Sequence, residues 1–151
     1  MPTSQEPDVT DAAELQRVLT RYIDSIDGYK EAAEVVEWPT LSEAFLEIAS
    51  RRKLIADHVA TLIAGQGKKP DESGSPEAII HRWWLRTRAV VSNEEFRTTL
   101  EECVRGEKEL FRTVDTALVH GNLDPAHAAV ISEVATELQE TLLTFESLMA
   151  D

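Results

Sequence analysis

Two charged residues, Arg52 and Glu107, stand at positions where the helical pattern of the sequence otherwise places apolar side chains. Arg52 interrupts the apolar series of the segment 40–64, and Glu107 interrupts that of a later segment ending at His120. Each lies near the middle of its segment. An unpaired charge in a protein interior costs several kcal/mol. Because the two charges have opposite signs, we predict a buried Arg52–Glu107 ion pair; the alternative is that Arg52 reaches outward and Glu107 lies at the edge of the fold.

Carboxylates and histidines elsewhere in the chain are the candidates for metal ligands. A di-metal centre in a helical bundle needs about four carboxylates and two histidines, with a Glu-x-x-His step that puts two ligands on one helix face. Such a ligand set suits iron or manganese. The sequence lacks that step. We therefore expect no catalytic residue, cofactor or metal; the alternative is an iron or manganese site built from Asp27, Glu34, His81, Glu102 and Glu107.

Most other ionisable residues lie outside the apolar positions of their helices and are expected on solvated faces; they include Asp24, Glu31, Glu137, Glu140 and Glu146. His127 falls in a first helical turn and is also expected to be exposed. Tyr22, Tyr29 and Cys103 fall on apolar stripes and are expected in the core, where the two tyrosine hydroxyls could reach the Arg52–Glu107 pair.

Apolar residues recur at spacings of three and four along five segments, which predicts five helices and no strand. The predicted helices run from Thr10 or Asp11 to Trp38-Pro39, from Thr40 to Ala64, from Ser75 to about Val91, from Ser92 or Asn93 to His120, and from Asp124-Pro125 almost to the C-terminus. Residues 1–9 are expected to form a flexible tail, and residues 10–151 a single domain. The fold class is all-α: a four-helix bundle whose short third helix lies in the connection between two halves.

The short third segment contains His81-Arg82-Trp83-Trp84. A helix of this length cannot bury both tryptophans on one side, so one of them is expected at a margin. A tryptophan exposed beside Arg82 would mark a protein contact or a homodimer seam. The alternative is a small-ligand pocket lined by Trp83 or Trp84.

The composition restricts the classes of partner. The 151 residues carry a net charge of −13, which opposes general binding to nucleic acid or to an anionic membrane surface. No apolar run approaches the roughly 20 residues that a membrane helix needs, and no signal peptide is evident. A single cysteine excludes an internal disulfide and a cysteine-based zinc site. We expect a cytoplasmic protein.

Five segments resemble a bacterial ferritin-like four-helix-bundle family catalogued as a domain of unknown function; they are residues 27–34, Phe45-x-x-x-Ala49-x-x-Arg52, residues 72–75, His81-Arg82-x-Trp84 and residues 101–107. The resemblance covers nearly the whole chain after the tail. It implies two helical hairpins joined by a long crossover. Di-iron relatives have Glu-x-x-His where this chain has Arg52 and Ile55, and family members often have a histidine where it has Phe145. The resemblance therefore implies a degenerate di-metal site.

We expect a non-catalytic bacterial protein that acts through a homo-oligomer, in the first instance a dimer, or through a protein partner. Analogy within the superfamily suggests a role in stress physiology. Two alternatives stay open: a di-iron or di-manganese oxidase or iron-handling protein, and a small-ligand-binding bundle.

Overall fold

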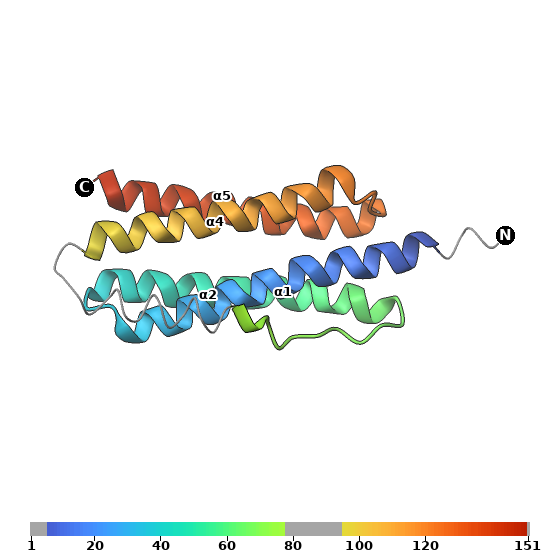
Figure 1. Ribbon diagram of the computed structural model, residues 1–151, viewed down its shortest axis with the longest axis horizontal. Helices are drawn as coiled ribbons and strands as arrows, with labels where there is room; N and C mark the ends of the chain where they lie inside the picture. The colour runs from blue at the N-terminus through green and yellow to red at the C-terminus, as the bar shows by residue number, and fades with distance from the viewer. Residues whose placement is uncertain (1–5, 78–94, 151) are drawn as a thin grey trace.

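The computed structural model describes residues 6–77 and 95–150, and within these ranges the chain is helical, with no strand. The helices are α1 (Glu6–Val35), α2 (Pro39–Gly65), α4 (Glu95–His120) and α5 (Pro125–Ala150). They form the all-α four-helix bundle that the sequence predicted (Figure 1). Most of the predicted third helix lies outside the described residues, as do His81, Arg82, Trp83 and Trp84.

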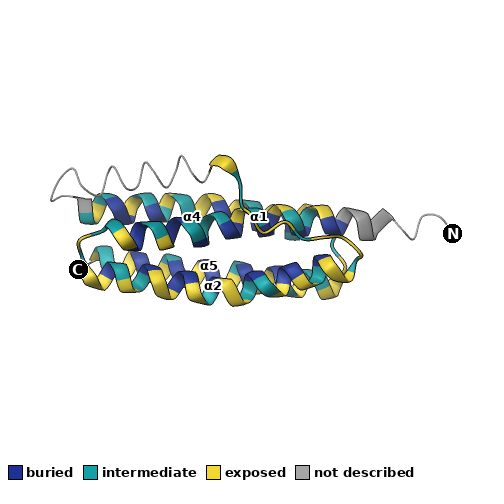
Figure 2. Cartoon of the chain, turned by 90° about the horizontal axis from the view of Figure 1, so that it is seen from below, coloured by how far each residue is buried: buried dark blue, intermediate teal, exposed yellow. Residues whose placement is uncertain are grey.

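The bundle consists of two antiparallel hairpins, α1–α2 and α4–α5, laid side by side (Figure 1). α1 begins and α5 ends at opposite ends of the bundle. After α2 the chain turns back and runs along the outer side of α1 (Figure 2). There the Gln16 amide exchanges two 2.9 Å hydrogen bonds with the backbone of Asp71, and the Asp24 carboxylate accepts bonds from Ser75 N and Oγ at 2.7 and 2.6 Å.

Helix α1 starts earlier than the sequence pattern predicted. It begins at Glu6 rather than at Thr10 or Asp11, so residues 6–9 belong to the helix. The sequence allows this start, because proline, here Pro7, is tolerated in a first helical turn. At the other end α1 stops at Val35, and Pro39 opens α2.

The turn between α4 and α5 depends on a glycine and on a local cap. A Cβ on Gly121 would lie 2.3 Å from the carbonyl oxygen of Ala117, so the chain can pass there only without a side chain. Asn122 follows with φ of 52°. The Asp124 side chain then caps α5 by accepting a 3.0 Å bond from Ala126 N.

The core is a continuous apolar column to which all four helices contribute. In Figure 2 buried residues recur along all four helices. Tyr29, Phe45 and Phe145 form an aromatic cluster, with ring centroids 5.2 to 6.3 Å apart. No helix in the described ranges combines the length and hydrophobicity needed to cross a bilayer.

Candidate functional site

The guanidinium of Arg52 lies fully buried between two carboxylates from the opposite hairpin. Its Nη2 forms an ion pair with Glu107 Oε1, and its Nη1 donates to Glu107 Oε2 at 3.0 Å. Its Nε donates to Glu137 Oε1 at 2.7 Å, and Nη1 also donates to Ser25 Oγ at 2.9 Å. The structure thus brings Arg52 and Glu107 together as an internal pair and adds a second carboxylate.

Two tyrosines of α1 complete the surroundings of Arg52. The Tyr22 hydroxyl donates to Glu137 Oε1 at 2.9 Å, and the Tyr29 hydroxyl donates to Glu107 Oε2 at 2.7 Å. Both rings have their centroids 5.4 Å from Arg52 Cζ, within cation–π range. Each tyrosine therefore contacts the cation through its ring and an anion through its hydroxyl.

A second arginine links this centre to the surface. Arg51 Nη2 lies 3.0 Å from Glu137 Oε2 and donates to Thr141 Oγ1 at 3.0 Å, while the Thr141 hydroxyl donates to Glu137 Oε2 at 2.7 Å. The Arg51 side chain is 35% exposed. Glu137 therefore bridges two guanidinium groups, one buried and one at the surface.

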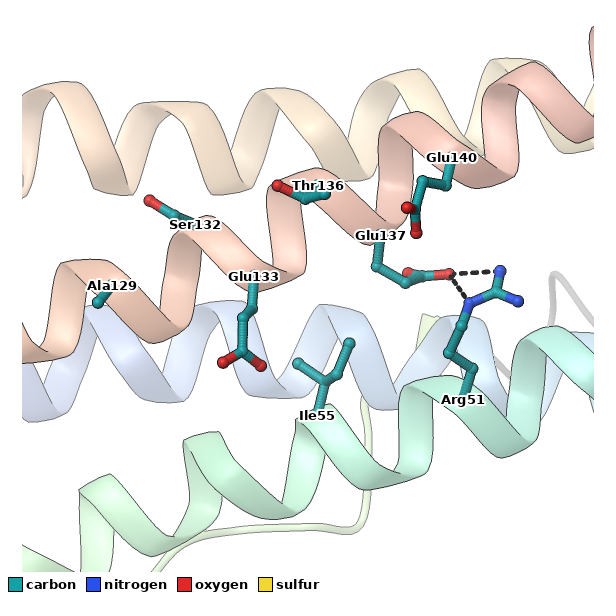
Figure 3. A pocket seen from close by; sticks show the side chains of 8 residues that line it. All are labelled: Arg51, Ile55, Ala129, Ser132, Glu133, Thr136, Glu137 and Glu140. Atoms are coloured by element: carbon teal, nitrogen blue, oxygen red, sulfur yellow. Dashed lines mark hydrogen bonds and ion pairs between the residues drawn. The ribbon is translucent and has the colours of Figure 1, made fainter.

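Arg51 also forms one wall of an open groove of about 380 Å³ between α2 and α5. Figure 3 shows Arg51 and Ile55 projecting from α2 toward the α5 side chains that line the other wall. Those α5 residues are Ala129, Ser132, Glu133, Thr136, Glu137 and Glu140. The groove is open to solvent and reaches the buried network only where Arg51 meets Glu137.

The charges of the centre fix its protonation. Burial, the largest single influence, lowers the pKa of Arg52. The charge of Glu107, its hydrogen bond and the smaller contributions of Tyr29 and Glu137 together outweigh burial, so the pKa lies above its ordinary value. Burial, and then the charge of Glu107, raise the pKa of Tyr29; burial and Glu137 do the same for Tyr22. Burial also raises the pKa of the Cys103 thiol. These groups therefore stay protonated, and Cys103 is no activated nucleophile.

The residues at the centre do not fit a pair of metal ions, because a fixed cation already occupies the space between the two carboxylates. All four oxygens of Glu107 and Glu137 accept hydrogen bonds from Arg51, Arg52, the tyrosines or Thr141. Within residues 6–77 and 95–150 no group of three or more His, Cys, Asp or Glu side chains could hold a metal ion.

The four candidates of the alternative metal site that lie within the described residues do not converge. Glu107 faces the centre, but Glu102 pairs with Arg105 at 2.9 Å and Glu34 is exposed. The Asp27 carboxylate lies beside Gly74 of the crossover. The fifth candidate, His81, lies outside the described residues.

Two expectations from the sequence are wrong. The sequence pattern predicts Glu137 on a solvated face, but Glu137 is 2% exposed, because the flank of α5 that carries it faces α2 and its arginines. His127 was expected to be exposed, but its side chain is only 16% exposed, with Nδ1 2.7 Å from Asp11 Oδ2. That oxygen also accepts a 3.0 Å bond from Asp124 N, so Asp11 ties α1 to the start of α5.

A signal for Glu137 was present in the sequence. Thr141 lies on the apolar stripe of the last helix, and Glu137 stands four residues before it, within reach of its hydroxyl. The five N–H groups of a buried arginine also need more acceptors than one carboxylate supplies. No comparable signal pointed to the pairing of Asp11 with His127, which are 116 residues apart.

Comparison with known proteins identifies both a family and a fold. The family model described as "Domain of unknown function (DUF2383)" matches residues 11–120. No curated protein matches. Among solved structures, an N-terminal deletion mutant of Dps from Mycobacterium smegmatis is similar, with a TM-score of 0.75 and 19% identity over 95% of this chain and 97% of that one. The tetragonal form of Mycobacterium smegmatis Dps also has a TM-score of 0.75, with 20% identity over 95% and 88%. At these identities the likeness shows a shared ferritin-like fold.

Proposed function

Because the chain belongs to the DUF2383 family, whose function is unknown, we propose that it is a non-catalytic ferritin-like bundle protein with a degenerate di-metal site. It acts through self-association or through a protein partner. The observation that carries this proposal is the position of Arg52, whose guanidinium lies between Glu107 and Glu137 at the centre of the bundle.

Charge balance supports the loss of metal chemistry. Two carboxylates of the centre pair with two guanidinium groups, that of Arg52, which is buried, and that of Arg51, which is partly exposed, so the centre needs no further cation. A metal ion would have to displace Arg52 from both carboxylates, leaving a guanidinium without a counterion in the core, which is strongly unfavourable.

The protonation of the centre supports a non-catalytic role. A general base or a nucleophile needs a pKa near the working pH and access to its substrate. Burial instead raises the pKa values of Tyr22, Tyr29 and Cys103, which keeps all three protonated.

Three exposed leucines support action through contacts with proteins. Leu46 and Leu54 on α2 and Leu143 on α5 expose 50%, 67% and 66% of their surfaces. Association over these helices would bury this apolar area, whereas the net charge of −13 opposes association through the acidic faces. A homodimer is the first arrangement to test, and we assign the protein to the bacterial cytoplasm. A role in stress physiology rests on the ferritin-like fold alone.

The groove between α2 and α5 supports a second candidate function, the binding of a small ligand. Its lining combines the apolar side chain of Ile55 with the hydroxyls of Ser132 and Thr136 and the guanidinium of Arg51. A ligand bound there would contact the buried network through Arg51 and Glu137. Shifts of backbone amide resonances at these residues, on titration with a small-molecule panel, would identify such a ligand.

Two measurements on the untagged wild-type protein test the main proposal. Elemental mass spectrometry, after anaerobic incubation with ferrous iron or manganese and desalting, should find almost no metal; a pair of metal ions per chain would favour the oxidase or iron-handling alternative. Sedimentation velocity over a wide concentration range should show a dimer or larger species. A monomer at every concentration would exclude action through self-association and leave action through a protein partner.

A further inference from the structure

We propose that the centre of the bundle is a receptor for a planar guanidinium cation. In the wild-type protein the side chain of Arg52 occupies this receptor. When the Arg52 side chain is shortened, a free alkylguanidinium fills the same place. This inference rests on the part of the proposed function that puts a guanidinium between Glu107 and Glu137. It adds the class of ligand that the centre selects.

The acceptors are arranged around the edge of the guanidinium plane. The two oxygens of Glu107 accept hydrogen bonds from Nη1 and Nη2 of Arg52, which is the bidentate geometry that matches a guanidinium group. Glu137 Oε1 accepts a hydrogen bond from Nε at 2.7 Å, and Ser25 Oγ accepts one from Nη1 at 2.9 Å. Three helices, α1, α4 and α5, thus supply acceptors to one planar group of α2.

The two tyrosine rings contact the same cation. Their centroids both lie 5.4 Å from Arg52 Cζ, and their hydroxyls hold the two carboxylates in place at 2.9 and 2.7 Å. Tyr22 and Tyr29 are seven residues apart on α1, about two helical turns, so one face of that helix presents both rings.

This arrangement favours a guanidinium over other cations. An ammonium ion is a compact, strongly hydrated charge. It cannot form the bidentate contact with Glu107, and it has no planar face to stack on an aromatic ring. A divalent metal ion would gain nothing from the ring faces of Tyr22 and Tyr29, and it would have to share both carboxylates with hydroxyl donors.

Chemical rescue of an Arg52→Ala variant tests the receptor. The substitution removes Cγ, Cδ and the guanidinium, which are the groups that ethylguanidinium carries. The melting temperature of Arg52→Ala should lie below that of the wild type. Millimolar ethylguanidinium should raise it by several degrees and reach saturation, whereas ethylammonium at equal ionic strength should not.

Three controls define the site. The wild type, in which Arg52 fills the receptor, should gain nothing from ethylguanidinium. Arg105→Ala, which removes an exposed arginine on α4, should also gain nothing. Adding Glu107→Gln to Arg52→Ala should abolish the rescue, because the bidentate acceptor is lost.

If Arg52→Ala does not fold alone, refolding with each cation and recovery of helical circular dichroism replace the melting experiment. The proposal is overturned if ethylguanidinium gives no gain in either format, if ethylammonium gives an equal gain, or if manganese stabilises the variant in its place. The proposed function is tested separately, because its metal and sedimentation measurements use the wild type.

Discussion

Arg52 Nε donates to Glu137 Oε1 across 2.7 Å and thereby joins α2 to α5 inside the bundle. The same side chain holds Glu107 of α4. Because α1–α2 and α4–α5 are separate hairpins, these contacts determine how one hairpin sits on the other. Apolar side chains tolerate several packing registers, whereas a buried guanidinium requires its carboxylates at specific positions.

Glu137→Ala tests the carboxylate that bridges the two arginines. The substitution leaves Arg52 with one carboxylate and Arg51 with none in the core, so it should lower the free energy of unfolding by about 3–5 kcal/mol. Urea unfolding followed by circular dichroism measures this. Glu140→Ala, on the exposed side of the same helix, should change it by less than about 0.5 kcal/mol. Equal effects of the two substitutions would contradict the buried position of Glu137.

Glu107→Ala tests the second carboxylate in the same way. It removes the bidentate partner of Arg52 and the acceptor of the Tyr29 hydroxyl, so a loss of about 3–5 kcal/mol is expected. Glu109→Ala, exposed on the same helix, is the matched control. A loss well under about 1 kcal/mol would show that Arg52 does not depend on Glu107.

How far the sequence alone predicts this molecule differs between fold and site. The helical periodicity predicted the four long helices, since each buries one apolar stripe. It also singled out Arg52 and Glu107, because a charge on such a stripe contradicts the pattern. Glu137 lies on a flank of its helix that the apolar pattern assigns to solvent, and the packing of α2 against α5 makes that flank an interior surface. Thr141 and the number of acceptors that a buried arginine needs are the only indications of it in the sequence. The pairing of Asp11 with His127 depends on tertiary structure in the same way.

The tyrosines should make stability fall at high pH. Burial and the neighbouring carboxylates raise the pKa values of Tyr22 and Tyr29 above the ordinary value of 10.0. The unfolded chain therefore releases these protons near pH 10, while the folded protein retains them. The stability that the two protonated tyrosines contribute is fully present below pH 10 and is lost as the pH rises further.

Absorbance titration can follow this directly, because the chain has only two tyrosines. Tyrosinate should appear together with the loss of helical circular dichroism. The appearance of tyrosinate near pH 10 in a fully helical protein would contradict the burial of both hydroxyls.

In Tyr29→Phe, the free energy of unfolding should be lower by about 1.5–3 kcal/mol near neutral pH, because Glu107 loses a hydrogen bond.

Two glycines should respond in opposite directions to alanine. Gly121→Ala places a Cβ 2.3 Å from the carbonyl oxygen of Ala117, so the turn between α4 and α5 must shift and the melting temperature should fall. Gly106 lies within α4 with nothing within 4 Å of a Cβ, so Gly106→Ala should stabilise the protein by up to about 1 kcal/mol. Thermal unfolding of both variants tests this. Destabilisation by Gly106→Ala would show a close approach that the structure lacks.

Nitrogen-15 NMR of the arginine side chains can show whether a buried guanidinium bridges Glu107 and Glu137 in solution. Arg52→Lys identifies the Arg52 signals by their loss. Held on both sides, the Arg52 guanidinium should rotate slowly about its C–N bonds, giving separate Nη–H resonances that exchange slowly with water. An exposed arginine such as Arg17 serves as the reference. Averaged, rapidly exchanging signals from Arg52, like those of Arg17, would show that its guanidinium is not held between the two carboxylates.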